Sequence, residues 1–110
     1  MMTIIMSAHA SQRFRERMPH FHDYGVLMEK AFLNRNRRPT DAKLKKYVEY
    51  LEHEKCYQGE TRYVSVYEGY IYIFSCSNKS STVYLRTVYK IDPQTVLNRS
   101  IRLALHRGKY

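Results

Sequence analysis

The sequence has few of the residues that build covalent, metal or phosphate-loop sites. It contains two cysteines, four glycines, three prolines and no tryptophan. Cys56 and Cys76 form no Cys-x-x-Cys pair, so we expect a cytoplasmic chain with reduced thiols. The glycines stand at positions 25, 59, 69 and 108, too far apart for a loop that cradles phosphates. His20 with His22, and His53 with Cys56, are pairs without further ligands, so no metal or other cofactor is expected.

Long hydrophobic runs are also absent. The longest apolar stretch is 70–74, the length of a strand and far below the roughly 18 residues of a membrane-spanning helix. Residues 1–6 are apolar, but they are too few for the core of a signal peptide and no basic residue precedes them. We therefore expect no membrane partner and a cytoplasmic location.

Acidic residues are scarce. Ten Asp and Glu against nineteen Lys and Arg give a net charge of +9 and a pI near 9.7. A chain of 110 residues closes one hydrophobic core, so we expect a single domain over 1–110. Clustered Lys and Arg favour a polyanionic partner, because they release counterions from a phosphate backbone, and RNA is the predicted partner. A basic surface kept for solubility is the alternative.

The first part of the chain predicts three helices. The expected N-caps are Ser7, Asp23 and Thr40. The first helix covers 8–17 and ends before Pro19. The second carries an apolar stripe at 26, 27 and 31 that ends at Leu33, and the third carries a stripe at 44, 47, 48 and 51.

The second part predicts strands and a closing helix. The period changes to two over 61–67, 70–77 and 82–91, and 3–6 is a short edge strand. Glu68-Gly69 is a two-residue hairpin signal, while Asp92-Pro93 starts a helix that Gly108 ends. The predicted class is α+β, with N-terminal helices packed on a three- to four-stranded antiparallel sheet and a C-terminal helix.

The first helix carries a candidate catalytic face. His9, Arg13 and Arg17 recur every four residues, so they stack along one side of a helix. An imidazole can exchange a proton near neutral pH, and a guanidinium can hold a phosphate with two N–H groups. This spacing suits phosphodiester chemistry. A solvated polar face is the alternative.

The last predicted strand carries two hydroxyls. Alternation places Val83, Leu85, Thr87 and Tyr89 on the face that should meet the helices. Thr87 and Tyr89 would then lie at the rim of the core, within reach of the first helix, where they could position a ribose and a phosphate. Both residue types are also ordinary strand formers, which is the alternative.

Basic and aromatic residues supply candidate RNA contacts. The chain contains eleven tyrosines, and RNA bases stack on exposed aromatic rings. The alternative is that these tyrosines are strand residues with buried rings. Basic side chains typically contact phosphates, and a solvated face is the alternative. The residues predicted to bind RNA are Arg17, Arg35, Arg37, Arg38, Lys43, Lys45, Lys46 and Arg86.

Two segments resemble a known group of proteins. The first is Ser7-Ala8-His9-Ala10-x-x-Arg13-Phe14-x-Glu16-Arg17 and the second is Leu85-Arg86-Thr87-Val88-Tyr89. They are similar to the "S/T-x-His-Ala-x-x-Arg-x-x-x-Arg" helix and the "hydrophobic-x-Thr-Val-Tyr" strand of small toxin-like domains. These belong to the barnase, colicin E5/D and RelE group of metal-independent ribonucleases, in which an N-terminal helical part packs on an antiparallel sheet.

The resemblance implies a toxin-like endoribonuclease that leaves a 2′,3′-cyclic phosphate. It implies His9 as general acid or base, Arg13 as phosphate ligand and Arg17 as a supporting cation. Thr87 would bind substrate beside Tyr89, and ribosome-bound message or tRNA would be the target, with an antitoxin or host protein as partner. The alternative is a non-catalytic phage or mobile-element protein that binds or inhibits a host protein or nucleic-acid complex.

Overall fold

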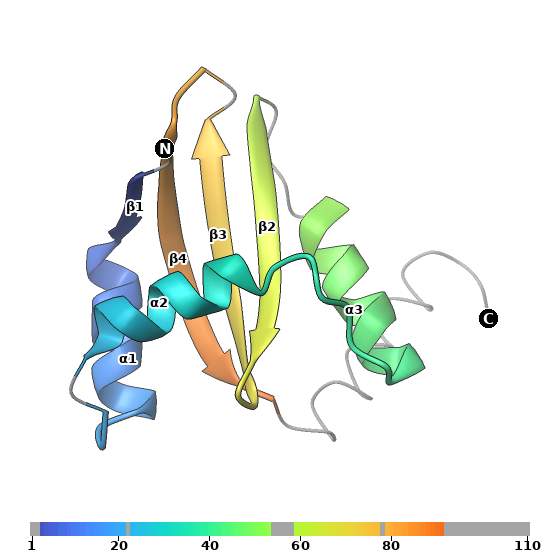
Figure 1. Ribbon diagram of the computed structural model, residues 1–110, viewed down its shortest axis with the longest axis horizontal. Coiled ribbons are helices and arrows are strands. Elements are labelled where there is room, and N and C mark those ends of the chain that lie inside the picture. The colour runs from blue at the N-terminus through green and yellow to red at the C-terminus, as the bar shows by residue number, and fades with distance from the viewer. Residues whose placement is uncertain (1–2, 22, 54–58, 78, 92–110) are drawn as a thin grey trace.

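The computed structural model describes residues 3–21, 23–53, 59–77 and 79–91 (Figure 1). The elements are β1 (Thr3–Met6), α1 (Ala8–Arg17), α2 (Tyr24–Leu33), α3 (Ala42–His53), β2 (Glu60–Tyr67), β3 (Tyr70–Ser77) and β4 (Thr82–Lys90). The predicted α+β class and the order of helices before a three-stranded meander are confirmed. The predicted helix from Asp92 to Gly108 lies outside the described residues.

The four strands form one mixed sheet with the order β1-β4-β3-β2. Strands β2, β3 and β4 are antiparallel neighbours, but β1 runs parallel to β4, from Thr3 beside Thr82 to Met6 beside Leu85. The prediction of an antiparallel sheet is therefore wrong for its edge strand. A hairpin forces its two strands to be antiparallel, whereas three helices and two strands separate β1 from β4, so no turn constrains their direction.

The β2–β3 hairpin closes at the predicted dipeptide. Glu68 has a φ of 51° and Gly69 a φ of 82°. Positive φ at both central residues defines a type I′ turn, whose twist matches that of the flanking strands. Tyr67 pairs with Tyr70 across it, and every later pair of the ladder follows from this register. Glu68 is the described non-glycine residue that adopts this left-handed conformation.

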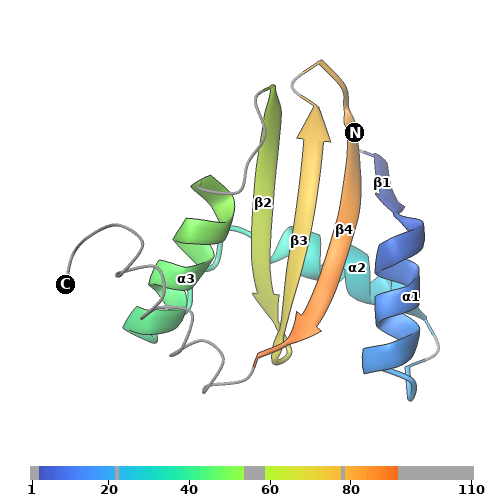
Figure 2. The same ribbon diagram turned by 180° about the vertical axis from the view of Figure 1, so that it is seen from behind.

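Helices cover both faces of the sheet. Phe14 of α1 and Phe32 of α2 pack with Phe74 and Leu85 in one core cluster. Ile73 of β3 belongs to a second cluster with the predicted α3 stripe of Leu44, Tyr47, Val48 and Leu51. Successive residues of a strand point to opposite faces, so α1 and α2 lie on one face and α3 on the other. Helix α2 crosses the strands in front of the sheet in Figure 1, and it lies behind the sheet in the reversed view of Figure 2.

The N-caps are confirmed for two of the three helices. Ser7 and Asp23 accept hydrogen bonds from backbone N–H groups of the first turns of α1 and α2. The cap predicted at Thr40 is wrong, because the Oδ1 atom of Asp41 accepts from the backbone N of Leu44 at 2.8 Å. Asp41 directly precedes the helix, and its carboxylate also suits the positive end of the helix dipole.

Helix α2 packs Leu27 and Ala31 of the predicted stripe into the core, but not Val26 or Leu33. Met28, Ala31 and Phe32 are buried, whereas Val26 and Leu33 are 43% and 77% exposed. The Phe32 ring fixes this rotation, because it packs edge-on against Phe74 with 5.1 Å between the ring centroids.

No described helix is long and apolar enough to cross a membrane.

Candidate functional site

Helix α1 is fixed along the outer edge of β4. The backbone N of Ser7 donates to the carbonyl of Leu85 at 3.1 Å, and the Ser7 hydroxyl also approaches the carbonyl of Arg86. At the other end of the helix, the Nη1 atom of Arg17 donates to the carbonyl of Val88 at 2.6 Å. Strand β1 pairs with β4 only as far as Leu85. Helix α1 therefore continues the coverage of the β4 edge where β1 ends.

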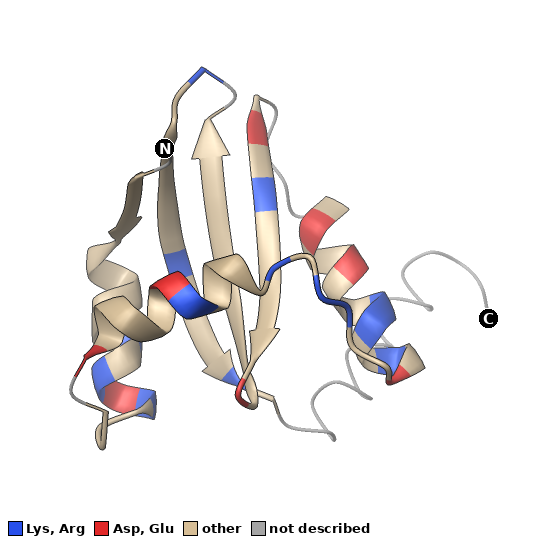
Figure 3. Cartoon of the chain, in the orientation of Figure 1, with Lys and Arg blue, Asp and Glu red and all other residues tan. Residues whose placement is uncertain are grey.

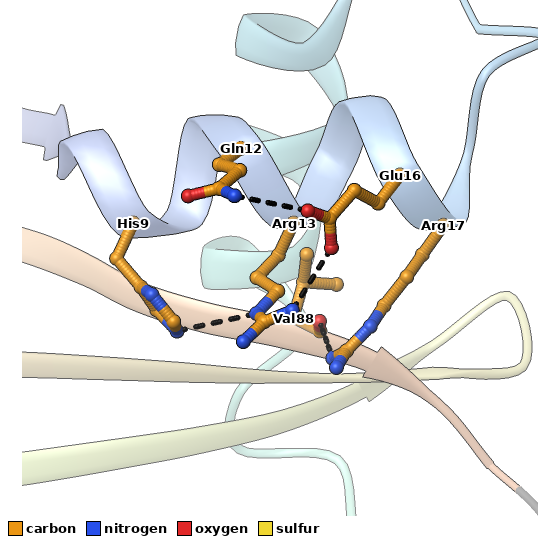
Figure 4. Close-up of polar contacts among 6 residues, drawn as sticks. All are labelled: His9, Gln12, Arg13, Glu16, Arg17 and Val88. Carbon is orange, nitrogen blue, oxygen red and sulfur yellow. Dashed lines mark hydrogen bonds and ion pairs between the residues drawn. The ribbon is translucent and has the colours of Figure 1, made fainter.

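The three predicted side chains of α1 form a ridge on the side that meets β4 (Figure 4). We call His9, Arg13 and Arg17 the α1 ridge. The Nε atom of Arg13 donates to Nε2 of His9 at 3.4 Å. This distance is at the long limit of a hydrogen bond, so the Arg13–His9 contact is readily exchanged for a ligand. His9 is exposed, and its Nε2 atom is the acceptor in this contact.

Glu16 orients the Arg13 guanidinium. Its Oε2 atom accepts from Nη1 of Arg13 at 2.9 Å, and its Oε1 atom accepts from Nε2 of Gln12 at 3.0 Å. The hydrogen bond from Gln12, followed by that from Arg13, lowers the pKa of the Glu16 carboxyl below its ordinary value. Glu16 therefore stays charged and holds Arg13 in place beside His9. Gln12 and Glu16 thus help to position Arg13. They are four residues apart, the spacing at which side chains meet on a helix surface.

A β-bulge in β4 changes which face its hydroxyls occupy. Leu85 pairs with Phe74 and Thr87 pairs with Ile73, so Arg86 is the extra residue. After the bulge Val88 joins Leu85 in the core beneath α1, and Thr87 lies on the opposite face of the sheet. The predicted placement of Thr87 on the core face is therefore wrong. Bulges commonly re-aim side chains beside functional sites.

The same shift separates Tyr89 from the core beneath α1. Tyr89 packs in the cluster of α3, and its hydroxyl lies 3.0 Å from the hydroxyl of Tyr47. The expectation that Tyr89 shares the face of Val83 and Leu85 is wrong for the same reason. The structure thus brings His9, Arg13 and Arg17 together along β4, places Thr87 just past the bulge, and joins Tyr89 to α3.

Arg86 lies on the sheet face opposite α1 and α2, among partners that the sequence analysis did not identify. Its Nε atom donates to the hydroxyl of Ser75 at 2.6 Å, and Nη2 lies 3.9 Å from the Glu60 carboxylate. Its guanidinium carbon is 4.9 Å from the ring centroid of Tyr84. Ser75 is the register partner of Tyr84, so strand pairing was the signal that could have identified it.

Basic residues gather in the segment between α2 and α3 and in the first part of α3 (Figure 3). Arg35 stacks over the Phe32 ring at 4.0 Å and donates to the Phe32 carbonyl, and Arg38 forms a two-bond ion pair with Glu52. Hydrogen bonding to Glu52 raises the pKa of Arg38. Both side chains therefore stabilise the fold. The other basic residues here, Arg37, Lys43, Lys45 and Lys46, are exposed, as is Arg38 itself.

No protein-family model, curated protein or solved structure matches the chain. Function is therefore inferred from its own residues. Within the described ranges, no three His, Cys, Asp or Glu side chains are grouped so that they could hold a metal ion.

Proposed function

We propose that the protein is an endoribonuclease that cleaves RNA without a metal, with His9 and Arg13 at its centre. The observation that carries the proposal is the pair itself: an exposed imidazole 3.4 Å from a guanidinium that Glu16 orients. Cleavage of RNA needs a base for the 2′-hydroxyl proton and a cation for the charge of the phosphorane. Nε2 of His9 and the guanidinium of Arg13 have these two capacities on adjacent turns of one helix.

In the proposed reaction His9 removes the proton from the 2′-hydroxyl, and the oxygen attacks the neighbouring phosphorus. Arg13 leaves His9 and binds the phosphate oxygens, whose negative charge rises in the transition state. The bond from phosphorus to the 5′ oxygen breaks, which leaves a 2′,3′-cyclic phosphate and a 5′-hydroxyl. Thr87 is the proposed hydroxyl contact to the substrate. The 5′ oxygen is proposed to take its proton from water, because the Tyr89 hydroxyl lies 3.0 Å from that of Tyr47 in the α3 cluster, on the sheet face opposite α1. Tyr89→Phe should therefore leave the rate unchanged.

The test is cleavage of single-stranded RNA, tRNA and ribosome-bound message in EDTA. His9→Ala and Arg13→Ala should each lower the rate by roughly 10²- to 10⁴-fold, and the products should carry 2′,3′-cyclic phosphate ends. His20→Ala and Arg15→Ala are the matched controls, because both residues are exposed. Arg15 is two residues from Arg13 and from Arg17, so it lies on another side of α1, and His20 follows the helix. A wild-type protein that cleaves none of these RNAs refutes the proposal. Cleavage that survives His9→Ala refutes the assignment of the base.

One observation favours the second candidate, a non-catalytic protein that binds a partner protein. Val26 and Leu33 are exposed and seven residues apart, so they lie on one face of α2. Exposed apolar side chains on one helix face are typical of protein interfaces. A pull-down with and without nuclease tests this function. A stoichiometric partner that survives nuclease and is lost with Leu33→Lys supports it, and recovery of nuclease-sensitive material alone contradicts it.

A further inference from the structure

The sheet face opposite α1 and α2 exposes two neighbouring large side chains close to the edge of β4 that α1 covers. Ile5 of β1 is the register partner of Tyr84 of β4, and the two side chains are 42% and 37% exposed. Ile4 and Met6 pack in the core with Val83, so alternation places Ile5 and Tyr84 on the other face. Helix α3 packs farther along this face, over Ile71 and Ile73. Among the described residues, an aromatic ring and an aliphatic side chain thus remain open to solvent side by side.

Arg86 completes this surface and has three partners in the sheet. Its guanidinium lies over the Tyr84 ring, and the hydroxyl of the buried Ser75 accepts from its Nε atom. The Nη2 atom of Arg86 lies 3.9 Å from the Glu60 carboxylate. An immobilised guanidinium and ring lose little conformational entropy when a ligand stacks on them. We call Ile5, Tyr84 and Arg86 the β4 platform.

The platform adjoins the α1 ridge through the backbone of β4. Ser7 binds the carbonyls of Leu85 and Arg86, and His9 follows two residues later on α1. The extra residue of the bulge is Arg86 itself, so the bulge places the platform and Thr87 on one face. Phosphate-binding cations and a stacking surface therefore lie next to each other on a protein with a net charge of +9.

We propose that the β4 platform stacks an unpaired base of single-stranded RNA whose backbone phosphate binds the α1 ridge. The identity of the ligand as RNA rests on the proposed function. Proteins that bind single-stranded RNA stack splayed bases on aromatic rings and Arg guanidinium planes. Bases inside a duplex are already stacked on their neighbours, so the platform selects single strands. Arg86 supplies a positive charge where the backbone of such a strand would pass.

The experiment measures affinity in a His9→Ala background, so that the RNA is not consumed. Tyr84→Ala should weaken binding of a single-stranded RNA by about ten-fold or more, while binding of an RNA duplex should not change. Tyr84→Leu should behave like Tyr84→Ala, because leucine keeps apolar contacts in the strand but lacks a ring face. Tyr84→Phe should retain single-strand affinity. Phe21→Ala removes a ring in the loop after α1 that is 47% exposed, more than Tyr84, and should change neither affinity.

The outcomes separate this proposal from the proposed cleavage. If the wild type cleaves no RNA, yet Tyr84→Ala weakens single-strand binding alone, the cleavage is refuted and the platform is supported. If the wild type cleaves RNA and Tyr84→Ala binds single strands as tightly as its parent, the platform is refuted and the cleavage stands. Equal losses for single strand and duplex, or for Tyr84→Ala and Phe21→Ala, also refute the platform.

Discussion

Replacing Arg17 by methionine should loosen α1 from β4. The Nη1 atom of Arg17 donates to the Val88 carbonyl at 2.6 Å, on the part of the β4 edge that β1 does not pair. A hydrogen bond from a charged donor contributes about 1.5–3 kcal/mol to folding. The Arg17 residue is exposed, so water competes for the same atoms, and we expect a loss of about 1 kcal/mol. Methionine keeps most of the aliphatic stem, which limits the change to the guanidinium.

Urea unfolding followed by circular dichroism measures this loss. For a domain of this size, about 1 kcal/mol corresponds to a shift of the midpoint by roughly 0.5–1 M urea at unchanged slope. Arg15→Met is the matched control, because Arg15 is exposed in the same last turn and carries the same charge. Equal midpoints for the two variants would show that the bond to Val88 does not fix the helix. Arg17 would then be free for the RNA contact that its sequence position predicts.

Two further predictions concern the hairpin and the core. Glu68→Asn should raise the free energy of unfolding by about 0.5–1 kcal/mol, because Asn-Gly suits the two positive φ angles of the turn. Thermal unfolding measures this gain, and a midpoint at or below that of the wild type contradicts the turn assignment. Burial raises the pKa of the Tyr72 hydroxyl in the folded protein above the value near 10 of the unfolded chain. The folded state is therefore favoured in full below pH 10, and this contribution to stability is lost as the pH rises above that value. Urea midpoints from pH 9 to 11 should therefore fall more steeply for the wild type than for Tyr72→Phe, and parallel curves would refute this.

Local signals in the sequence predict most of the fold. Ser7 and Asp23 are short polar residues that cap helices through atoms within three residues, and Glu68-Gly69 sets the hairpin register by its own backbone angles. Thr40 and Asp41 are both good caps, so composition alone does not choose between them. The parallel direction of β1 depends on contacts with residues near 84, which no local pattern encodes.

The candidate site shows where prediction from sequence fails. The spacing of His9 and Arg13 is a helical property, and the contact between them follows from it. The faces of Thr87 and Tyr89 depend on one extra residue in β4, and no glycine marks it. The signal was the apolar residue Val88, three positions after Leu85 where strict alternation requires two. Two partners of Arg86, Ser75 and Glu60, lie on β3 and β2, so these contacts could be predicted only from the register of the strands.

The attachment of α1 to β4 determines when the proposed site is assembled during synthesis. The hydrogen bonds that Ser7 and Arg17 make with β4 join residues 79 and 71 positions apart. Contacts this distant in sequence form late, because the intervening loop must first be closed. His9 and Arg13 leave the ribosome early, but they acquire their place along β4 only after β4 has been synthesised and paired. Under the proposed function, a partly made chain therefore carries the residues of a ribonuclease without its active arrangement.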